Sequence, residues 1–156
     1  AEQMREFAFK DALTGVNNRA SMVDLMMKAV LRTKRAEKLM LIAFIDIDDF
    51  KTINDKYGHE MSDRCIKHVA DMLILSTRET DTVFRLGGDE FVIMLEGFTH
   101  VDEMHTLLRK ILEGMVATPE MNRRGIGLRI SIGAMIFPFG DVHEVDAMSS
   151  EADSAM

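Results

Sequence analysis

The stretch TVFRLGGDEFVIML (residues 82–95) contains two short apolar segments separated by two glycines and two acids. Both segments have the composition of β-strands, and the glycine pair between them predicts a hairpin. Glycine tolerates positive φ and aspartate bonds back to its own backbone, so a turn alone accounts for Gly87, Gly88 and Asp89. This hairpin is the starting point for the predicted topology.

The segments around the glycine turn alternate between helical and strand-like hydrophobic patterns. The patterns predict strands at 39–47, 82–86, 90–95 and 127–137. They predict helices at 21–38, 62–76 and 101–115. Ser62 or Asp63 is expected to cap the first turn of the second helix. This order is typical of an α+β fold with a ferredoxin-like or palm β-α-β-β-α-β core. An extra helix precedes the core at the N-terminus, and helices flank a central sheet that contains antiparallel strands.

The predicted topology brings acids from distant parts of the sequence together. The first two core strands run parallel, and the third lies antiparallel between them. The glycine turn then lies beside the end of strand 39–47, which closes with Asp46 and Asp48. We therefore expect these two acids to face Asp89 and Glu90 at one edge of the sheet.

Several carboxylates at one edge repel each other unless a cation lies among them. Magnesium fits, because it prefers oxygen ligands and shares its coordination shell between one or two carboxylates and substrate phosphates. Two such ions about 4 Å apart can activate an attacking oxygen and stabilise a leaving one in phosphoryl transfer. Gly87 and Gly88 would let a bulky substrate approach the backbone. The spacing alone favours such a metal site no more than a solvated acidic turn.

The composition argues against several classes of function. The 156 residues are 47% apolar and 29% charged, which is typical of one soluble globular domain. A net charge of -7 argues against a general nucleic-acid or membrane-surface binder, because both need a basic face. Cys65 is the only cysteine, which excludes an intramolecular disulfide and suits a reducing cytoplasm. No apolar run is long enough to span a membrane, so any anchor is expected outside this sequence.

Four segments, in order along the chain, resemble the motifs of one family. They are DALTGVNNR (11–19), FIDIDDFKTINDKYGHEMSD (44–63), GGDEF (87–91) and RISIGAM (129–135). Together they resemble the GGDEF domains, the bacterial diguanylate cyclases, and make residues 1–156 a single such domain. The resemblance implies that two GTP molecules condense into cyclic di-GMP and two pyrophosphates. It further implies a homodimer, because each domain binds one GTP and each 3′-hydroxyl attacks the α-phosphate of the other GTP. An upstream sensor or regulatory domain is implied as well.

The resemblance also implies roles for individual residues. The ligands of Mg²⁺, or of Mn²⁺ in its place, would be Asp46, the Ile47 carbonyl, Asp89 and Glu90. The catalytic residues would be Asp89, which helps to deprotonate the 3′-hydroxyl, Glu90 and Lys51. The groups in contact with the substrate phosphates would be Lys51 and the amides of Asp49 and Phe50, with Gly87 and Gly88 beside them.

Asn54 and Asp63 would bind the guanine base. The role of Asp63 also follows from chemistry, because guanine presents N1–H and an amino group on one edge and a carboxylate accepts both. Adenine would leave that carboxylate partly unpaired, a loss that can discriminate by about 10⁴ or more. A cyclase for another purine nucleotide is disfavoured for this reason. The structural alternative for Asp63 is a helix cap, and the two roles are compatible.

The tetrapeptide RETD (78–81), with five residues between it and the glycine pair, resembles the family's R-x-x-D inhibitory site for its own product. The guanidinium of Arg78 suits a phosphate or a guanine edge, because it donates two parallel hydrogen bonds. An exposed salt bridge between Arg78 and Asp81 is the structural alternative. The match in spacing favours product binding.

The sequence departs from the family motifs at two places. Ser62 stands where the G-H-x-x-G-D motif has its second glycine. The last residues, EADSAM (151–156), resemble the start of a terminal helix whose basic residues help to hold the triphosphate, and the sequence stops before them. We therefore expect weaker GTP binding by a domain truncated here. The alternative to an enzyme is a catalytically silent module that binds GTP or cyclic di-GMP.

Overall fold

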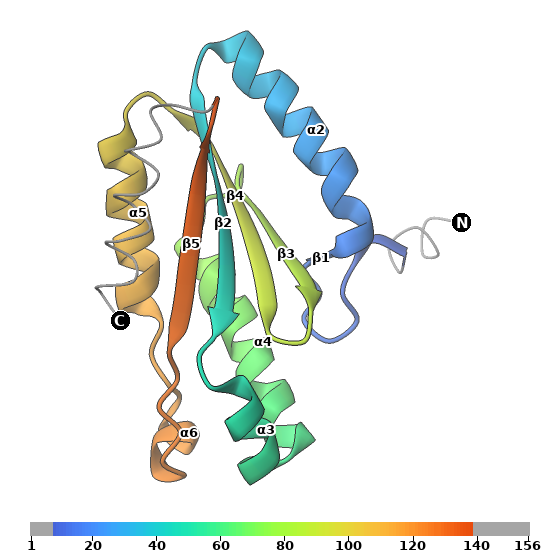
Figure 1. Cartoon of the computed structure of the whole chain (residues 1–156), viewed down its shortest axis with the longest axis vertical. Helices are drawn as coiled ribbons and strands as arrows, with labels where there is room; N and C mark the ends of the chain where they lie inside the picture. The colour runs from blue at the N-terminus through green and yellow to red at the C-terminus, as the bar shows by residue number, and fades with distance from the viewer. Residues whose placement is uncertain (1–7, 139–156) are drawn as a thin grey trace.

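A computed structural model describes residues 8–138. The strands are β1 (Asn17–Asn18), β2 (Leu39–Ile47), β3 (Thr82–Gly87), β4 (Glu90–Phe98) and β5 (Ile130–Phe137). The helices are α2 (Arg19–Ala36), α3 (Phe50–Tyr57), α4 (His59–Ser76), α5 (Val101–Gly114) and α6 (Pro119–Arg123). The predicted α+β core is confirmed as the order β2-α4-β3-β4-α5-β5, preceded by α2 (Figure 1).

The strands form one sheet in the order β1-β3-β4-β2-β5. β4 pairs antiparallel with both β2 and β3, so β2 and β3 run parallel on either side of it, as predicted. β5 pairs antiparallel with the other edge of β2. Consequently the β3–β4 turn and the end of β2 lie at the same end of the sheet (Figure 1).

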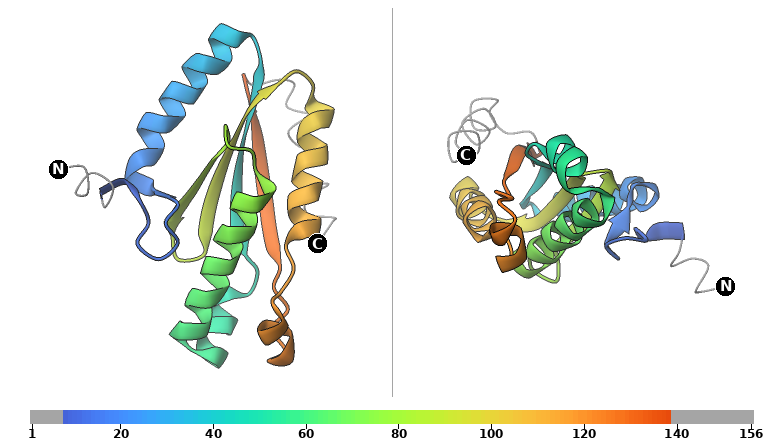
Figure 2. Two further views of the ribbon diagram at one scale, coloured as in Figure 1. Left: turned by 180° about the vertical axis from the view of Figure 1, so that it is seen from behind. Right: turned by 90° about the horizontal axis from the view of Figure 1, so that it is seen from below.

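Helices cover both faces of the sheet (Figure 2). α4 and α5 lie on one face, over the larger core that contains Ile45 and Phe91. α2 lies on the other face, over a smaller apolar cluster that contains Met40 and Phe84. Successive side chains of a strand point to opposite faces, so a central strand covered on both sides must be apolar throughout. This accounts for the unbroken apolar sequence of most of β2.

The bounds of α2 differ from the prediction by two residues at each end. Its N-cap is Asn18, whose side chain accepts a hydrogen bond from the Ser21 N–H. The helix ends before Glu37, which adopts the left-handed conformation at φ 52°. Lys34 and Arg35 lie in the last turn, where positive charge interacts favourably with the helix dipole.

The expectation that Ser62 or Asp63 caps the second predicted helix is wrong. That helix, α4, begins three residues earlier, at His59, and its N-cap is Gly58. Gly58 has φ 87° and also ends α3, which allows the two helices to meet at one residue. Ser62 is therefore buried inside the first turn of α4, and Asp63 is exposed next to it.

Three short elements were absent from the predicted series, namely β1, α3 and α6. β1 has only two residues, and its pairing with β3 is long-range, so no periodicity marks it. The apolar positions of α3 follow helical spacing, but the helix is only eight residues long. β4 extends three residues further than predicted, and β5 begins three residues later.

The segment 151–156, with its resemblance to a terminal helix, lies outside the described residues. Within residues 8–138, none of the helices combines the length and apolar character that a bilayer crossing requires.

Candidate functional site

The structure brings Asp46 and Glu90 together at the end of β2. Asp46 lies directly opposite Glu90 in the β2–β4 register, and opposite Ser131 in the β2–β5 register. Asp89 lies in the turn between β3 and β4, one residue before Glu90. Directly opposed residues of an antiparallel pair have Cβ atoms about 4.5–5.5 Å apart and share a face of the sheet. The convergence expected from the topology is therefore present for Asp46 with Asp89 and Glu90, whereas the carboxylate of Asp48 is hydrogen-bonded to Ser131 of β5.

The acidic cluster is not neutralised by the protein. Burial, and then repulsion from Asp89, Glu90 and Asp48, raises the pKa of Asp46 above its usual value. Among residues 8–138, no basic side chain forms an ion pair with Asp46, Asp89 or Glu90. The same part of the chain holds no group of three acids, histidines or cysteines that could bind a metal by themselves. The donors fit a cation that completes its shell with a backbone carbonyl, water and phosphate oxygens.

The link between β2 and α3 places backbone N–H groups next to this cluster. Asp49, the N-cap of α3, has φ 55° and ψ 29°, a conformation uncommon outside glycine, and its side chain makes no capping hydrogen bond. The first N–H groups of α3 therefore suit an anion. Lys51 is exposed in the first turn. Asp48 is held in place, because its N–H donates to the Arg129 carbonyl at 2.8 Å and its carboxylate accepts a hydrogen bond from the Ser131 hydroxyl.

Asn54 and Asp63 lie on the two helices that meet at Gly58. Asn54 is half-buried on α3, and Asp63 is exposed on α4. The N–H of Gly58 donates to the Asn54 carbonyl at 2.9 Å. Ser62 is 2% exposed, and its hydroxyl oxygen lies 3.1 Å from Asn54 Oδ1 and 3.0 Å from the Gly58 carbonyl oxygen. The two predicted guanine contacts thus belong to one helical corner.

A partly buried ion pair that was not predicted connects the N-terminal segment to the β3–β4 turn. Arg85 donates from Nη1 to both carboxylate oxygens of Asp11, at 3.0 and 3.1 Å. It also donates from Nε and Nη2 to the Gly88 carbonyl, at 3.0 and 2.8 Å. The side chains of Arg85 and Asp11 are 13% and 17% exposed. These residues are 74 positions apart, so no local pattern in the sequence pairs them.

The environment of Asp11 favours its ionised form. Burial alone raises the pKa of this carboxyl, but hydrogen bonds from Thr14 and Arg85, together with the charge of Arg85, outweigh burial and lower the pKa overall. The Thr14 hydroxyl and N–H donate to Asp11 Oδ2 at 2.7 and 2.9 Å. The Asp11 carboxylate is therefore a fixed anion that orients the Arg85 guanidinium.

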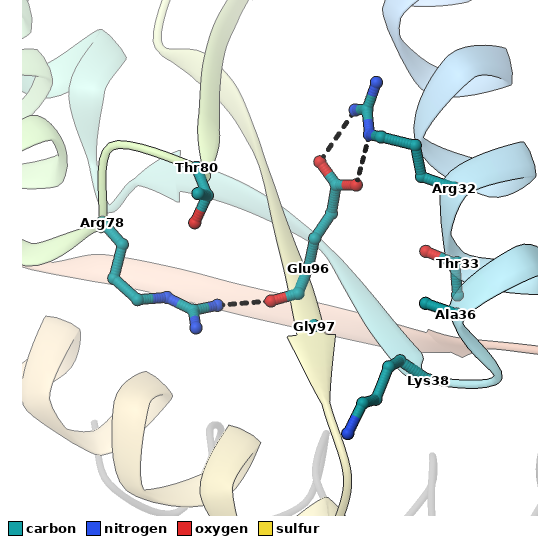
Figure 3. A pocket seen from close by; sticks show the side chains of 8 residues that line it. All are labelled: Arg32, Thr33, Ala36, Lys38, Arg78, Thr80, Glu96 and Gly97. Atoms are coloured by element: carbon teal, nitrogen blue, oxygen red, sulfur yellow. Dashed lines mark hydrogen bonds and ion pairs between the residues drawn. The ribbon is translucent and has the colours of Figure 1, made fainter.

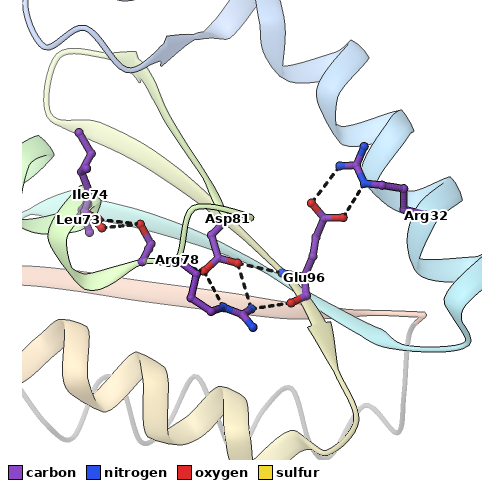
Figure 4. Close-up of polar contacts among 7 residues, drawn as sticks. Arg32, Leu73, Ile74, Arg78, Asp81 and Glu96 are labelled. Carbon is purple, nitrogen blue, oxygen red and sulfur yellow. Dashed lines mark hydrogen bonds and ion pairs between the residues drawn. The ribbon is translucent and has the colours of Figure 1, made fainter.

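Arg78 and Asp81 form a closed turn just before β3, at the opposite end of this strand from Gly87 (Figure 4). The side chain of Asp81 is 0% exposed. It accepts hydrogen bonds from the Arg78 N–H at 2.8 Å, from the Arg78 guanidinium at 3.1 Å twice, and from the Glu96 N–H at 3.2 Å. Arg78 also donates to the Glu96 carbonyl at 2.5 Å and lies over the Phe98 ring, 4.7 Å from its centroid. The salt bridge considered as the structural alternative is therefore present.

A pocket of about 600 Å³ opens beside Arg78 (Figure 3). Arg32 and Lys38 line it as well, and Glu96 is the acid among its lining residues. Arg32 holds Glu96 with two hydrogen bonds of 3.0 Å. Because Arg78 is paired with Asp81 and Arg32 with Glu96, Lys38 is the cation of this lining that has no acidic partner within the described residues, which leaves the pocket a small positive excess. Arg32 and Lys38 were not among the predicted site residues, because they come from the end of α2 and the link after it, forty or more positions before Arg78.

The comparison with family models identifies one match. A model described as "Diguanylate cyclase, GGDEF domain" matches residues 8–156. This span contains every segment that builds the acidic cluster, the helical corner and the Arg78 turn.

Similar proteins include two curated cyclases. The chain is 34% identical over 155 residues to the diguanylate cyclase DgcP of Pseudomonas aeruginosa, covering 99% of this chain and 23% of DgcP. It is 32% identical over 155 residues to the diguanylate cyclase DgcS of Shewanella oneidensis, covering 99% of this chain and 50% of DgcS. The chain thus spans half or less of the length of these relatives.

A solved structure agrees with the fold. A fragment of TpbB, also called YfiN, from Pseudomonas aeruginosa, comprising only the GGDEF domain, aligns with a TM-score of 0.78 and 29% identity. The alignment covers 94% of this chain and 85% of that one.

Proposed function

The chain belongs to the GGDEF family of diguanylate cyclases, and we propose that it converts two GTP molecules into cyclic di-GMP and two pyrophosphates. Each 3′-oxygen forms a bond to the α-phosphorus of the other GTP, the bond to pyrophosphate breaks, and the hydroxyl proton is released. The observation that carries this proposal is the register that sets Asp46 opposite Glu90, beside the N-terminus of α3. A site with unneutralised carboxylates next to free backbone N–H groups suits a metal–triphosphate complex.

Asp46, Asp89, Glu90 and the Ile47 carbonyl would hold Mg²⁺ or Mn²⁺. The bound ion supplies Lewis acidity at the phosphate and offsets its charge. The raised pKa of Asp46 supports this role, because its causes are burial and neighbouring acids, and a cation would relieve the repulsion. Asp89 lies in the turn next to this site, where it can accept the proton of the attacking 3′-hydroxyl.

The remaining substrate contacts follow the chain from β2 into α4. The N–H groups of Asp49 and Phe50 and the side chain of Lys51 would bind the phosphates, whose charge increases in the transition state. Gly87 and Gly88 have open space where a Cβ would stand, which supports an approach of the substrate to this turn. The carboxylate of Asp63 would accept the two N–H donors of guanine, with Asn54 beside it.

Catalysis needs two copies of the chain. Each copy has one such site, whereas the product contains two equivalent phosphodiester bonds. We therefore propose a homodimer in which two sites face each other, with each GTP donating its hydroxyl to the other. Because the chain spans half or less of its relatives, an upstream sensor or regulatory domain would control this pairing, in the cytoplasm where GTP is available.

The pocket beside Arg78 would bind the product and inhibit the enzyme. Cyclic di-GMP carries two phosphates, and three cationic side chains line this pocket. Arg78 can take part without losing Asp81, because the two N–H groups of its Nη1 make no hydrogen bond within residues 8–138. The buried carboxylate of Asp81 would hold the guanidinium in place for the ligand.

Incubation with GTP and MgCl₂, followed by chromatographic separation of the nucleotides, tests the proposed activity on the longest natural form of the protein. We expect cyclic di-GMP from the wild type, at least about 10²-fold less from Asp89→Ala, and an unchanged rate from Asp55→Asn, an exposed acid of α3 outside the cluster. GTP binding without any cyclic product would instead support the silent binding module. Absence of product, together with no binding of either GTP or cyclic di-GMP, would refute both functions.

A further inference from the structure

Ser62 differs from the family motif and occupies a position where it can act on the guanine site. It stands where the motif has glycine, in the first turn of α4. It is one of three buried polar or charged residues in the described part of the chain. Its hydroxyl has one hydrogen and two acceptors within reach, Asn54 Oδ1 on α3 at 3.1 Å and the Gly58 carbonyl oxygen at 3.0 Å. A glycine at this position could make neither contact.

The contact has a consequence for the orientation of the Asn54 amide. An asparagine side chain has one carbonyl oxygen and one NH₂ group, which point in opposite directions. When the Ser62 hydroxyl donates to this oxygen, the NH₂ group remains as the donor on the other side of the amide. The neighbouring Asp63 carboxylate can only accept when ionised. The corner then presents one donor and one acceptor side chain together.

We infer that Ser62 is a positioning residue for guanine recognition. It fixes the Asn54 side chain so that the Asn54 NH₂ group donates to an acceptor atom of the base. The Asp63 carboxylate then accepts hydrogen bonds from N1–H and the amino group of guanine. This inference rests on the proposed function. Guanine carries both kinds of group on its rim, whereas adenine lacks the paired N1–H and amino donors. The hydroxyl therefore contributes to binding of the base without contacting the base itself.

Titration calorimetry with α,β-methylene GTP and MgCl₂ tests this inference, because the analogue lacks the scissile oxygen and measures binding alone. Ser62→Ala should weaken binding by about 2- to 12-fold, the range that one hydrogen bond spans. The affinity for inorganic tripolyphosphate with MgCl₂ should stay the same, since that ligand has no base. Ser21→Ala is the matched control, because Ser21 is also buried in a first helical turn, and its hydroxyl donates only to the Asn18 carbonyl, at 2.8 Å.

A double-mutant cycle separates positioning from a general effect on folding. In an Asn54→Ala background, Ser62→Ala should cause no further loss of GTP-analogue affinity, since there is no amide left to orient. Three results would each overturn the inference. They are additive losses of affinity in the double mutant, equal losses of affinity for the analogue and for tripolyphosphate, and no loss of affinity in Ser62→Ala. If the wild-type protein fails to bind the GTP analogue, the proposed function is overturned together with this inference. If the wild type binds the analogue selectively and Ser62→Ala binds it with the same affinity, the inference alone is overturned.

Discussion

The substitution Asp46→Asn should stabilise the protein when no metal is present. Burial and three neighbouring acids raise the pKa of Asp46, so its ionised form is less favourable in the folded state than in the unfolded state. Like charges directly opposite in a sheet destabilise by about 0.2–1 kcal/mol, and Asp46 lies directly opposite Glu90. For a domain of this size, that corresponds to a rise of about 0.5–4 °C in Tm. Asparagine has nearly the same shape, so packing is unchanged.

The pH dependence has a definite sign. Because the folded-state pKa is raised, the destabilisation from Asp46 is absent below its unfolded pKa and grows as the pH rises through the folded pKa. The advantage of Asp46→Asn should therefore be small near pH 3.5 and largest at neutral pH. Thermal unfolding in EDTA at several pH values, followed by circular dichroism, measures this difference.

Ligand should reverse the order of stability. With MgCl₂ and α,β-methylene GTP at 100 times its Kd, the wild type gains about 2.7 kcal/mol, and Asp46→Asn should gain less because a metal ligand is lost. Asp55→Asn should follow the wild type in both conditions, since surface substitutions usually change stability by less than about 0.5 kcal/mol. A Tm of Asp46→Asn equal to or below the wild type in EDTA at pH 7 would refute the electrostatic argument.

Three further predictions concern other parts of the molecule. Asp81→Ala should lower stability by about 2–3 kcal/mol, because it leaves two backbone N–H groups and a guanidinium without their buried partner. Arg78→Ala should also lower stability, by about 1–3 kcal/mol, because it leaves the buried Asp81 carboxylate with backbone donors alone. Chemical denaturation measures both, and no loss in either variant would contradict the burial of Asp81. Asp11→Asn should lower the free energy of unfolding by about 1.5–3 kcal/mol at pH 7. Since the folded-state pKa of Asp11 is lowered, this difference from the wild type should persist above pH 3.8 and disappear as the pH falls through the folded-state pKa. Acid unfolding measures it, and a difference that does not change with pH would contradict the stabilising role of the Asp11 carboxylate. Cys65 is 0% exposed, and burial raises the pKa of its thiol. A disulfide reagent should therefore label Cys65 only after unfolding. Rapid labelling of the native protein would show that α4 opens.

The sequence predicted the parts of the fold that depend on local patterns. β2 has the predicted bounds, because a long apolar run closed by acids is a strong signal for a central strand. The convergence of Asp46 and Glu90 followed from the predicted β-α-β-β-α-β topology, which places the end of β2 beside the β3–β4 turn. The start of α4 was misplaced because Gly58 permits two helices to meet at one residue, which sequence periodicity does not reveal.

Contacts between distant residues were beyond prediction. Arg85 pairs with Asp11 across 74 positions, and Arg32 pairs with Glu96 across 64. Each partner alone has the appearance of an ordinary surface charge. The contact of Ser62 with Asn54 was missed for a different reason, because it depends on the exact start of α4. The predicted roles of the metal ligands, phosphate contacts and guanine contacts stay predictions until ligands are bound.

The guanidinium of Arg85 joins two parts of the molecule that lie far apart in the sequence, 74 positions from one another at Asp11 and Arg85. It holds the Asp11 carboxylate, just after the chain enters the domain, and the Gly88 carbonyl, one residue before Asp89. The two hydrogen bonds to Asp11 are partly buried and the two to the Gly88 carbonyl are exposed, and all four are 2.8–3.1 Å long, so a displacement of the segment around Asp11 reaches the hairpin through direct hydrogen bonds. A movement of the segment around Asp11 is therefore transmitted through Arg85, a residue of β3, to the turn that carries Asp89.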